Sequence, residues 1–259
     1  MKVQYLSAGI VITILIILIF TVSIFTSRSN RNNSADILSS SVIPPNTVEM
    51  QFRDRNYWIS FINIPDIKRL YLYPNFEKQV SSESLMRESK CQNLISGGFY
   101  TKDNQPLGLL TSEGYTIREK TNNILINGIF YVLLNNQFGI VTSAYPLQNA
   151  RLALQSGPII IERSKQRKIS IRNDKTARRV VLGMTESKEL FFFIIHDKEN
   201  ILLGPYLSQL PEFMHVLGNK MGIKIDYAMN LDGGRASAFH SDYYHVTEVT
   251  YIGSYFCLI

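Results

Sequence analysis

The sequence predicts an α+β fold with a mixed β-sheet core and two or three helices, preceded by a single N-terminal transmembrane helix. Many short runs are rich in aromatic and β-branched residues, which favours strands, whereas only two or three segments have helical periodicity. Strands and helices do not alternate regularly, which argues against a doubly wound sheet. The 259 residues are 45% hydrophobic and 11% aromatic, and this composition excludes a disordered chain.

The first 27 residues predict a membrane anchor. No charged side chain occurs from Val3 to Ser27, and about 20 apolar residues in a helix suffice to cross a bilayer. We therefore expect residues 7–26 to span the membrane. A cleaved signal peptide is the alternative, but its apolar region would be shorter and a small-residue cleavage site should follow. Here the sequence Ser-Arg-Ser-Asn-Arg follows instead.

The order of the segments predicts an exported domain. Basic residues are nearly balanced across the span, so the positive-inside rule decides little. A short N-terminal tail ahead of one long domain favours export, and we expect a membrane-anchored protein whose domain is extracytoplasmic. We divide the chain into a transmembrane anchor at 1–27, a flexible stalk at 28–47 without periodicity, and a globular domain at 48–259.

The globular domain begins with strands. Residues 57–64 and 68–73 are aromatic and β-branched and predict two strands joined by a turn at Pro65-Asp66. Two asparagines, 135–136, separate the apolar runs 124–134 and 137–144, a pattern typical of a hairpin. Further strands are predicted at 151–155, 158–162, 178–184, 190–196 and 228–231, with a terminal core strand in 251–259.

Two segments have the pattern of helices. Residues 82–93 begin with Ser82 and Ser84, either of which can act as an N-cap, and contain an apolar stripe. Residues 207–221 place apolar side chains at spacings of three, one and three. We expect these two helices to pack against the sheets.

The strongest local motif is Asn-Leu-Asp-Gly-Gly-Arg-Ala-Ser at 230–237. A hydrophobic strand ends in the carboxylate of Asp232, and the two glycines that follow let the backbone approach a ligand closely. Successive N–H groups in such a turn can bind an anion. The alternative is a tight turn in which Asp232 is only a local cap.

Two other polar breaks interrupt apolar runs. Ser-Gly-Gly-Phe-Tyr at 96–100 contains a glycine pair that indicates close approach of a backbone or ligand, or equally a β-bulge. Leu-Gln-Ser-Gly-Pro at 154–158 separates two strands, and Gln155 is either a ligand contact or an ordinary turn residue.

Positive charge is concentrated in one segment, Arg163–Arg179, which has eight Lys or Arg and one acid, a net +7, against +6 for the whole chain. Such a run is commonly a solvated loop. Arg179 opens an apolar strand, however, and a guanidinium suits bidentate binding of phosphate or carboxylate. The run lacks interleaved aromatic residues, so we do not expect nucleic-acid binding.

In their order along the chain, Gly-Gly-Phe-Tyr, Pro-x-Gly, Gln-Ser-Gly-Pro, Arg-x-x-x-Gly and Asn-Leu-Asp-Gly-Gly resemble the phosphodiester glycosidase domain family. The resemblance covers roughly residues 90–257. Ser96 stands where the family has Asn, and Arg235 and Ala236 stand where it has Gly and Ser. The positions that match are Gln155, Arg179, Asn230, Asp232, Gly233, Gly234 and Ser237.

The resemblance implies a hydrolase that cleaves the glycosidic bond of sugar-1-phosphodiesters. With the predicted anchor, we expect a membrane-anchored enzyme of surface polysaccharide metabolism, and we expect no cofactor or metal. The resemblance implies catalytic roles for Asp232, Arg179 and Asn230. The substrate-binding residues that it implies are Gly97, Gly98, Gln155, Gly233, Gly234 and Ser237. A non-catalytic glycan-binding or polyanion-binding protein on the same fold is the alternative.

The two cysteines and four histidines leave less to infer. Two Cys cannot form a disulfide-dense scaffold or a four-Cys zinc site. Cys91 and Cys257 can pair in an exported domain, or can be two buried thiols. The histidines lack metal-ligand spacing, and we expect His240 to be a loop residue rather than part of the site.

Overall fold

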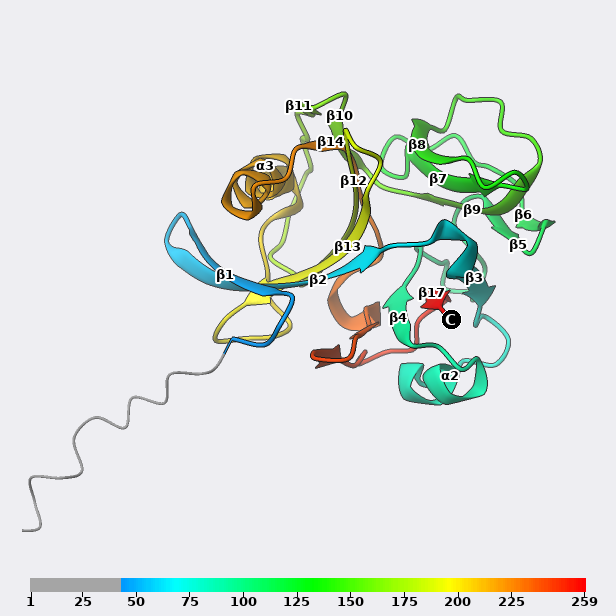
Figure 1. Cartoon of the computed structure of the whole chain (residues 1–259), viewed down its shortest axis with the longest axis horizontal. Helices are drawn as coiled ribbons and strands as arrows, with labels where there is room; N and C mark the ends of the chain where they lie inside the picture. Colours follow the sequence, from blue (N-terminus) through cyan, green and yellow to red (C-terminus); the bar gives the residue numbers. More distant parts are fainter. Residues whose placement is uncertain (1–42) are drawn as a thin grey trace, which may run out of the picture. The chain divides into compact units, whose positions relative to one another are not determined.

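A computed structural model describes residues 43–259, and these form three antiparallel sheets (Figure 1). The largest has the order β1 (Thr47–Phe52), β2 (Arg55–Ile64), β13 (Leu190–Asp197), β12 (Arg179–Thr185), β14 (Ile225–Asn230), β10 (Ile159–Glu162) and β11 (Lys165–Gln166). The second has the order β16 (His245–Val246), β15 (Phe239–His240), β4 (Asn93–Ser96), β17 (Ser254–Leu258) and β3 (Leu70–Pro74). The third has the order β6 (Tyr115–Arg118), β5 (Leu110–Ser112), β9 (Ala150–Ser156), β7 (Gly128–Leu133) and β8 (Phe138–Thr142).

Two α-helices accompany the sheets. Helix α3 (Leu210–Met221) has Pro211 in its first turn and ends at Gly222, which has φ 69° as a left-handed C-cap requires. Helix α2 (Ser82–Glu88) is shorter than predicted, and its N-cap is Ser81, whose side chain accepts from Ser84 N. The prediction of Ser82 or Ser84 as cap was therefore wrong. Three short 3-10 turns, η1 (Ile67–Arg69), η2 (Leu207–Gln209) and η3 (Gly234–Ala236), complete the structure.

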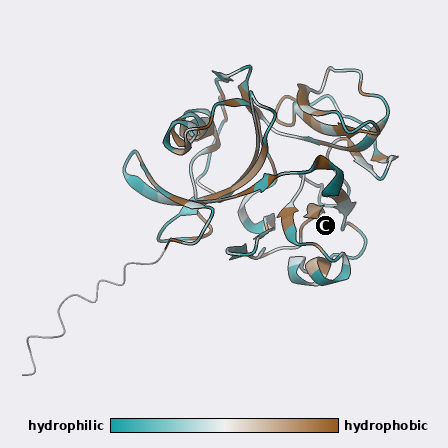
Figure 2. Ribbon diagram, in the orientation of Figure 1, coloured by the Kyte–Doolittle hydropathy of each residue, from teal (hydrophilic) through white to brown (hydrophobic). Residues whose placement is uncertain are grey.

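The large sheet separates two hydrophobic clusters. One lies between the sheet and α3 and includes Phe213, Met214 and Leu217. The other joins the opposite face of the sheet to the two smaller sheets through residues such as Phe192 and Phe256, whose ring centroids are 4.9 Å apart. Figure 2 shows hydrophobic residues concentrated along the strands. Burial on both faces explains the nearly continuous apolar sequence of β13.

The predicted α+β class is confirmed, as are the hairpin and the long strands. Of the two or three helices predicted, residues 43–259 contain two. The two strands predicted on either side of Pro65-Asp66 exist, but they belong to different sheets: β2 pairs with β13, and β3 pairs with β17. Within residues 43–259 no helix is long and apolar enough to cross a membrane. The predicted span at 7–26 and most of the predicted stalk lie outside the described residues.

Cys91 and Cys257, for which the sequence left two possibilities open, form a disulfide. The bond links the loop after α2 to β17 across a sequence separation of 166 residues. A cross-link over so long a segment restricts the unfolded chain strongly.

Replacing both cysteines by serine should lower the free energy of unfolding by about 2–4 kcal/mol, because the unfolded chain regains the entropy of an open loop. Denaturant unfolding with and without reductant measures the effect. Wild-type protein should lose stability when reduced, whereas the double-serine variant should not respond to reductant. Equal stability of the two oxidised proteins would contradict the prediction.

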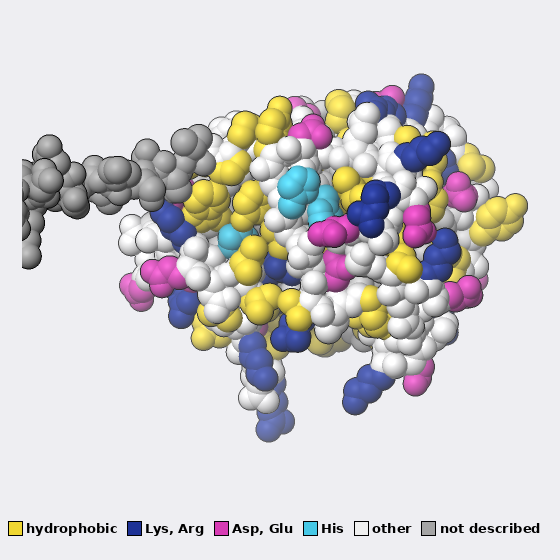
Figure 3. Space-filling model, turned by 90° about the horizontal axis from the view of Figure 1, so that it is seen from below, with side chains coloured by type: hydrophobic (Ala, Val, Ile, Leu, Met, Phe, Trp, Pro, Cys, Tyr) yellow, Lys and Arg dark blue, Asp and Glu magenta, His cyan; other side chains and the backbone are white. Residues whose placement is uncertain are grey.

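A buried polar network joins α2 to β15 and β16. Ser82 Oγ lies 2.7 Å from His240 Nε2 and donates to the Glu248 carboxylate, which also accepts from Ser82 N at 2.8 Å. His240 Nδ1 faces His245 Nδ1 at 3.4 Å. With Ser82 donating to Glu248, His240 Nε2 donates to Ser82 and its Nδ1 is left as acceptor. Figure 3 shows histidine and acidic side chains side by side on one face.

Stability should fall as the pH drops below about 6.5, the ordinary pKa of histidine. Burial, aided by His245, lowers the pKa of His240 in the folded protein, although Glu248 and Glu83 oppose the shift. The unfolded chain therefore binds the proton more readily, and acid favours unfolding.

Urea unfolding at several pH values between about 7.5 and about 5 measures this dependence. The variant His240→Gln keeps a donor near Ser82 but does not titrate, so its stability should change less over this range. The same dependence in both proteins would contradict the assignment to His240.

Candidate active site

The three residues predicted to be catalytic lie at the adjoining ends of β12 and β14. Leu231 N donates to Val180 O over 2.8 Å, in continuation of the antiparallel pairing of these strands. This register places Asp232 opposite Arg179. Arg179 and Asn230 share one face of the sheet, because Asn230 pairs with Val181 and side chains alternate between the faces. The structure thus brings together residues that are 51 or more positions apart in the sequence.

Asp232 also joins the glycine-pair motif to this site. Its N–H donates to Gly97 O at 3.0 Å, and Ser96 Oγ donates to its carbonyl oxygen at 3.4 Å. Burial raises the pKa of the Asp232 carboxyl well above its ordinary value, and a hydrogen bond from Gly233 N opposes this only in part. The pKa of Tyr100 is raised, chiefly by burial. A hydrogen bond with Thr250 opposes this shift, and the negative charge of Asp232 adds to it. A strongly shifted carboxyl at a strand end is typical of acid–base sites.

Arg179 lies at the edge of a pocket of about 400 Å³. Its guanidinium donates to Pro205 O through Nε at 2.9 Å and to Lys175 O through Nη2 at 2.7 Å, while the nearest carboxylate, Asp174, is 3.9 Å away. Within residues 43–259 the Arg179 Nη1 atom donates no hydrogen bond. It is also not enclosed by the protein. One edge of this cation is therefore available to an anionic ligand.

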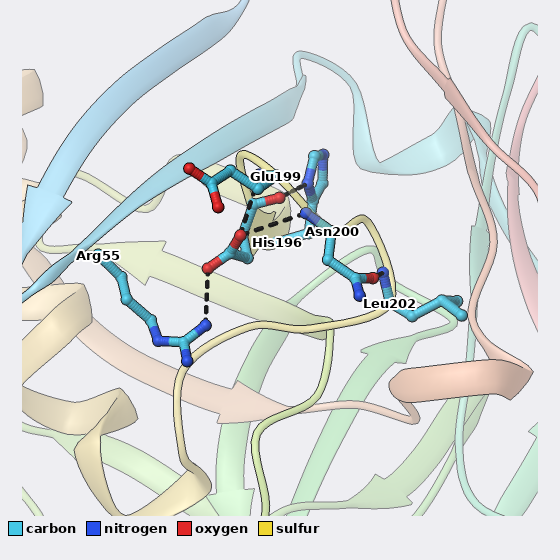
Figure 4. Close-up of polar contacts among 6 residues, drawn as sticks. Arg55, His196, Glu199, Asn200 and Leu202 are labelled. Atoms are coloured by element: carbon cyan, nitrogen blue, oxygen red, sulfur yellow. Dashed lines mark hydrogen bonds and ion pairs between the residues drawn. The ribbon is translucent and has the colours of Figure 1, made fainter.

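The loop 197–205 holds the bound edge of Arg179 in place. Asp197 accepts two backbone N–H groups of this loop, at 2.9 and 3.2 Å, and its other oxygen accepts from Arg55 Nη1 at 3.1 Å (Figure 4). Burial alone would raise the pKa of Asp197, but these hydrogen bonds lower it overall. An ionised Asp197 thus orders the loop that presents Pro205 O to Arg179.

The glycines predicted to bind substrate bring backbones together. A Cβ on Gly97 would lie 2.5 Å from Ser254 Oγ, and one on Gly233 would lie 2.5 Å from Arg178 O. The N–H groups are already used within the fold: Gly97 N donates to Ser254 O, and Gly234 N, at φ 61°, donates to Arg178 O. Gly98 N likewise donates to Ser254 Oγ. These N–H groups therefore stabilise the backbone around the site.

The Gly233→Ala substitution should destabilise the fold by about 2–3 kcal/mol, because the new methyl group meets a backbone oxygen that cannot rotate away. Gly98→Ala is the matched control. Its nearest contact is the flexible Leu154 Cδ1 at 2.9 Å, so the loss should be about 1 kcal/mol. Thermal unfolding compares the two variants, and a smaller loss for Gly233→Ala than for Gly98→Ala would contradict the expectation.

Gln155 and Ser237 are buried and committed to hydrogen bonds within the protein. Gln155 Oε1 accepts from Leu109 N and Thr121 N, and its Nε2 donates to Thr121 O and Ile126 O. Ser237 Oγ accepts from Arg178 Nε at 2.8 Å and donates to Gly234 O at 2.8 Å. Both side chains therefore stabilise the backbone segments that surround the site.

Asn230 differs from these two residues. Its Nδ2 donates to Gly157 O at 3.0 Å, but its Oδ1 is buried and has no partner among residues 43–259. An unpaired buried acceptor is costly and is often found at functional sites. Gly157 itself lines the pocket that contains Arg179, which places Asn230 directly behind that pocket.

A model of the phosphodiester glycosidase family matches residues 89–252. The chain belongs to this family. A search of curated proteins finds no match. Among solved structures, this chain is similar to the catalytic domain of zebrafish N-acetylglucosamine-1-phosphodiester alpha-N-acetylglucosaminidase, auto-inhibited by its pro-peptide. The TM-score is 0.63, with 14% identity over 82% of this chain and 81% of that one.

The chain described here, a member of the phosphodiester glycosidase family, is also similar to two bacterial structures. A hypothetical protein from Synechocystis has TM-score 0.55 and 12% identity over 82% of this chain and 61% of that one. A protein from Burkholderia pseudomallei, described as exported, has TM-score 0.54 and 10% identity over 79% of this chain and 74% of that one. At these identities the likeness establishes the fold.

Sequence reasoning missed two residues that interact with the candidate site. Arg178 was included only in the basic run, yet it is 1% exposed and bonds Ser237. Tyr100, close enough to Asp232 for its pKa to respond, was part of a motif but had no role assigned. Its place two residues after the glycine pair was the available signal. No group of three His, Cys, Asp or Glu side chains within residues 43–259 is arranged to hold a metal ion.

Proposed function

We propose that this protein hydrolyses the glycosidic bond of sugar-1-phosphodiesters. The observation that supports the proposal is that Asp232, a carboxyl with a raised pKa, follows β14 where this strand adjoins the start of β12. Arg179 opens β12 and is a cation with one free edge on a pocket. Membership of the phosphodiester glycosidase family gives the bond type.

In the proposed reaction Arg179 binds the phosphate and stabilises the charge that grows on it as the bond between C1 and the phosphate oxygen breaks. The leaving group is a phosphate monoester, which is stable as an anion and needs little protonation. Asp232, in its ionised form, takes a proton from water as the water oxygen bonds to C1. The products are a free sugar and a phosphate monoester.

The other predicted residues have positioning roles in this proposal. Asn230 donates to Gly157 O and so positions one wall of the pocket, since its own Oδ1 is enclosed. Gly97, Gly98, Gly233 and Gly234 hold the backbone around Asp232. Gln155 and Ser237, which were expected to bind substrate, act through the loop and the arginine that they bond.

We also propose that residues 7–26 anchor the protein in a membrane, with the domain extracytoplasmic and acting in surface polysaccharide metabolism. The uncharged segment from Val3 to Ser27 supports the anchor. The second candidate function is non-catalytic glycan or polyanion binding. It is favoured by Ser96 and Ala236, where this chain departs from the family pattern.

A screen of the full-length protein against UDP-sugars and sugar-1-phosphodiesters tests the proposal, with release of free sugar as the readout. Release by the wild-type protein and not by Asp232→Ala is expected. Binding of these compounds without release, equally strong in both proteins, would overturn hydrolysis and establish the binding function.

A further inference from the structure

The pocket beside Arg179 has mostly apolar walls. They come from loops before and after the sheets and include Phe99, Leu107, Leu125, Pro158 and Leu207. A volume of about 400 Å³ suits a small ligand or one part of a larger one. A sugar is poorly matched to such walls, because its hydroxyl groups would lose their hydrogen bonds with water.

The charged groups of this pocket all come from one segment of the chain, residues 174–179, and are Asp174, Lys175 and Arg179. Arg179 contributes the free Nη1 edge described above. The carboxylate of Asp174 accepts from Leu207 N at 3.2 Å and Ser208 N at 2.8 Å. Burial acts to raise the pKa of Asp174, but these bonds and Arg179 lower it overall, so that it stays ionised and occupied. Lys175, which is exposed, also lines the pocket. The pocket therefore offers two cations, of which Arg179 has a free edge, beside mainly apolar walls.

The apolar surface continues beyond the mouth of the pocket. Ile124 is 78% exposed and Leu125, which lines the pocket, is 50% exposed. The loop that carries them is held by Gln155, whose side chain bonds Thr121 N, Thr121 O and Ile126 O. The fold thus fixes two adjacent apolar side chains in solvent at the entrance of an apolar pocket.

We infer that this pocket binds an apolar aglycone, so that the substrates are sugar-1-phosphodiesters whose second ester group is an alkyl or isoprenoid chain. The inference rests on the proposed function. The phosphate bound at Arg179 lies between two regions: the sugar C1 on the side of Asp232, and the apolar chain on the side of Leu107 and Leu125. A nucleotide aglycone would instead bring a polar base against apolar walls, which is unfavourable.

The test compares the full-length protein on N-acetylglucosamine 1-phosphodiesters that have methyl or hexyl as the second ester group. Each buried methylene adds about 0.8 kcal/mol, so even partial burial should raise kcat/KM for the hexyl ester about tenfold or more over the methyl ester. Leu125→Ser should reduce this ratio towards one. The matched control is Leu134→Ser, an exposed leucine outside the pocket, which should leave the ratio unchanged.

Hydrolysis of both esters at the same rate would overturn the aglycone inference and leave the proposed function standing. If neither ester is hydrolysed, calorimetry with hexyl phosphate still measures the pocket without catalysis. Hexyl phosphate that binds at least about tenfold more tightly than inorganic phosphate, with the advantage lost in Leu125→Ser, would support the pocket while the proposed function fails. Equal binding of the two phosphates would overturn the inference.

Discussion

The Asp232→Asn variant should lose activity by about a thousandfold, since general acid–base groups contribute about 10²–10⁴ to rate and asparagine cannot take up a proton. The same change should make the protein more stable at neutral pH. Burial raises the folded-state pKa of Asp232 above its unfolded value, so the folded protein is penalised once the carboxyl ionises. Asparagine has nearly the same shape and removes this penalty.

Two measurements on the same samples test this expectation. Release of free sugar gives kcat/KM, and thermal unfolding at about pH 8 and about pH 4 gives the stability of each form. The stability gain should be large at the higher pH and small at the lower one, which lies close to the pKa of about 3.9 that Asp232 has in the unfolded chain. Wild-type kcat/KM should rise with pH as Asp232 ionises. An active Asp232→Asn protein would exclude Asp232 as the base.

Much of the fold could be predicted because local sequence determines it. The strands β12 and β13 are uninterrupted apolar runs buried on both faces, and α3 has a clear periodic stripe with Gly222 at its end. The pairing of strands was less accessible. Nothing local to Pro65-Asp66 indicates that β2 and β3 enter different sheets, because that choice depends on β13 and β17, which are more than 120 residues further along.

The site shows the same division between local and long-range information. The sequence singled out Asp232 and the glycine pair, because a carboxylate and glycines that interrupt apolar runs are unusual. The hydrogen-bond partners of each side chain could not be predicted from the sequence. Gln155 was expected to touch substrate, yet all its hydrogen-bonding positions are filled by backbone groups 29 to 46 residues away. Only the folded arrangement of the loops brings those groups to it.

The basic run 163–179 is best understood residue by residue. Its first part is exposed, and Arg167 pairs there with Glu162 at 3.3 Å. Its last two residues differ. Arg179 has a free edge on the pocket, whereas Arg178 lies directly before β12, where burial lowers its pKa to about 10. The high net charge of the run thus combines solvated cations with two that have separate roles.

Arg178→Met should therefore destabilise the fold by about 3–5 kcal/mol, because three acceptors lose a charged donor in a buried place. Arg178 Nε donates to Ser237 Oγ at 2.8 Å, and its Nη2 donates to Ser237 O at 2.7 Å and Thr247 O at 3.2 Å. These bonds fix the segment that follows Asp232 to β12, so the variant should lose activity only through loss of folded protein.

Arg179→Met provides the matched comparison, since it makes the same change one residue along the chain. It removes two bonds to backbone carbonyls, at Pro205 and Lys175, and should destabilise the fold by only about 1–2 kcal/mol. Its kcat/KM should fall about a hundredfold or more at temperatures where it is fully folded, because the phosphate loses its cation. Urea unfolding and sugar release on both variants separate the two roles. If Arg178→Met were the stable, inactive variant and Arg179→Met the unstable one, the two assignments would have to be exchanged.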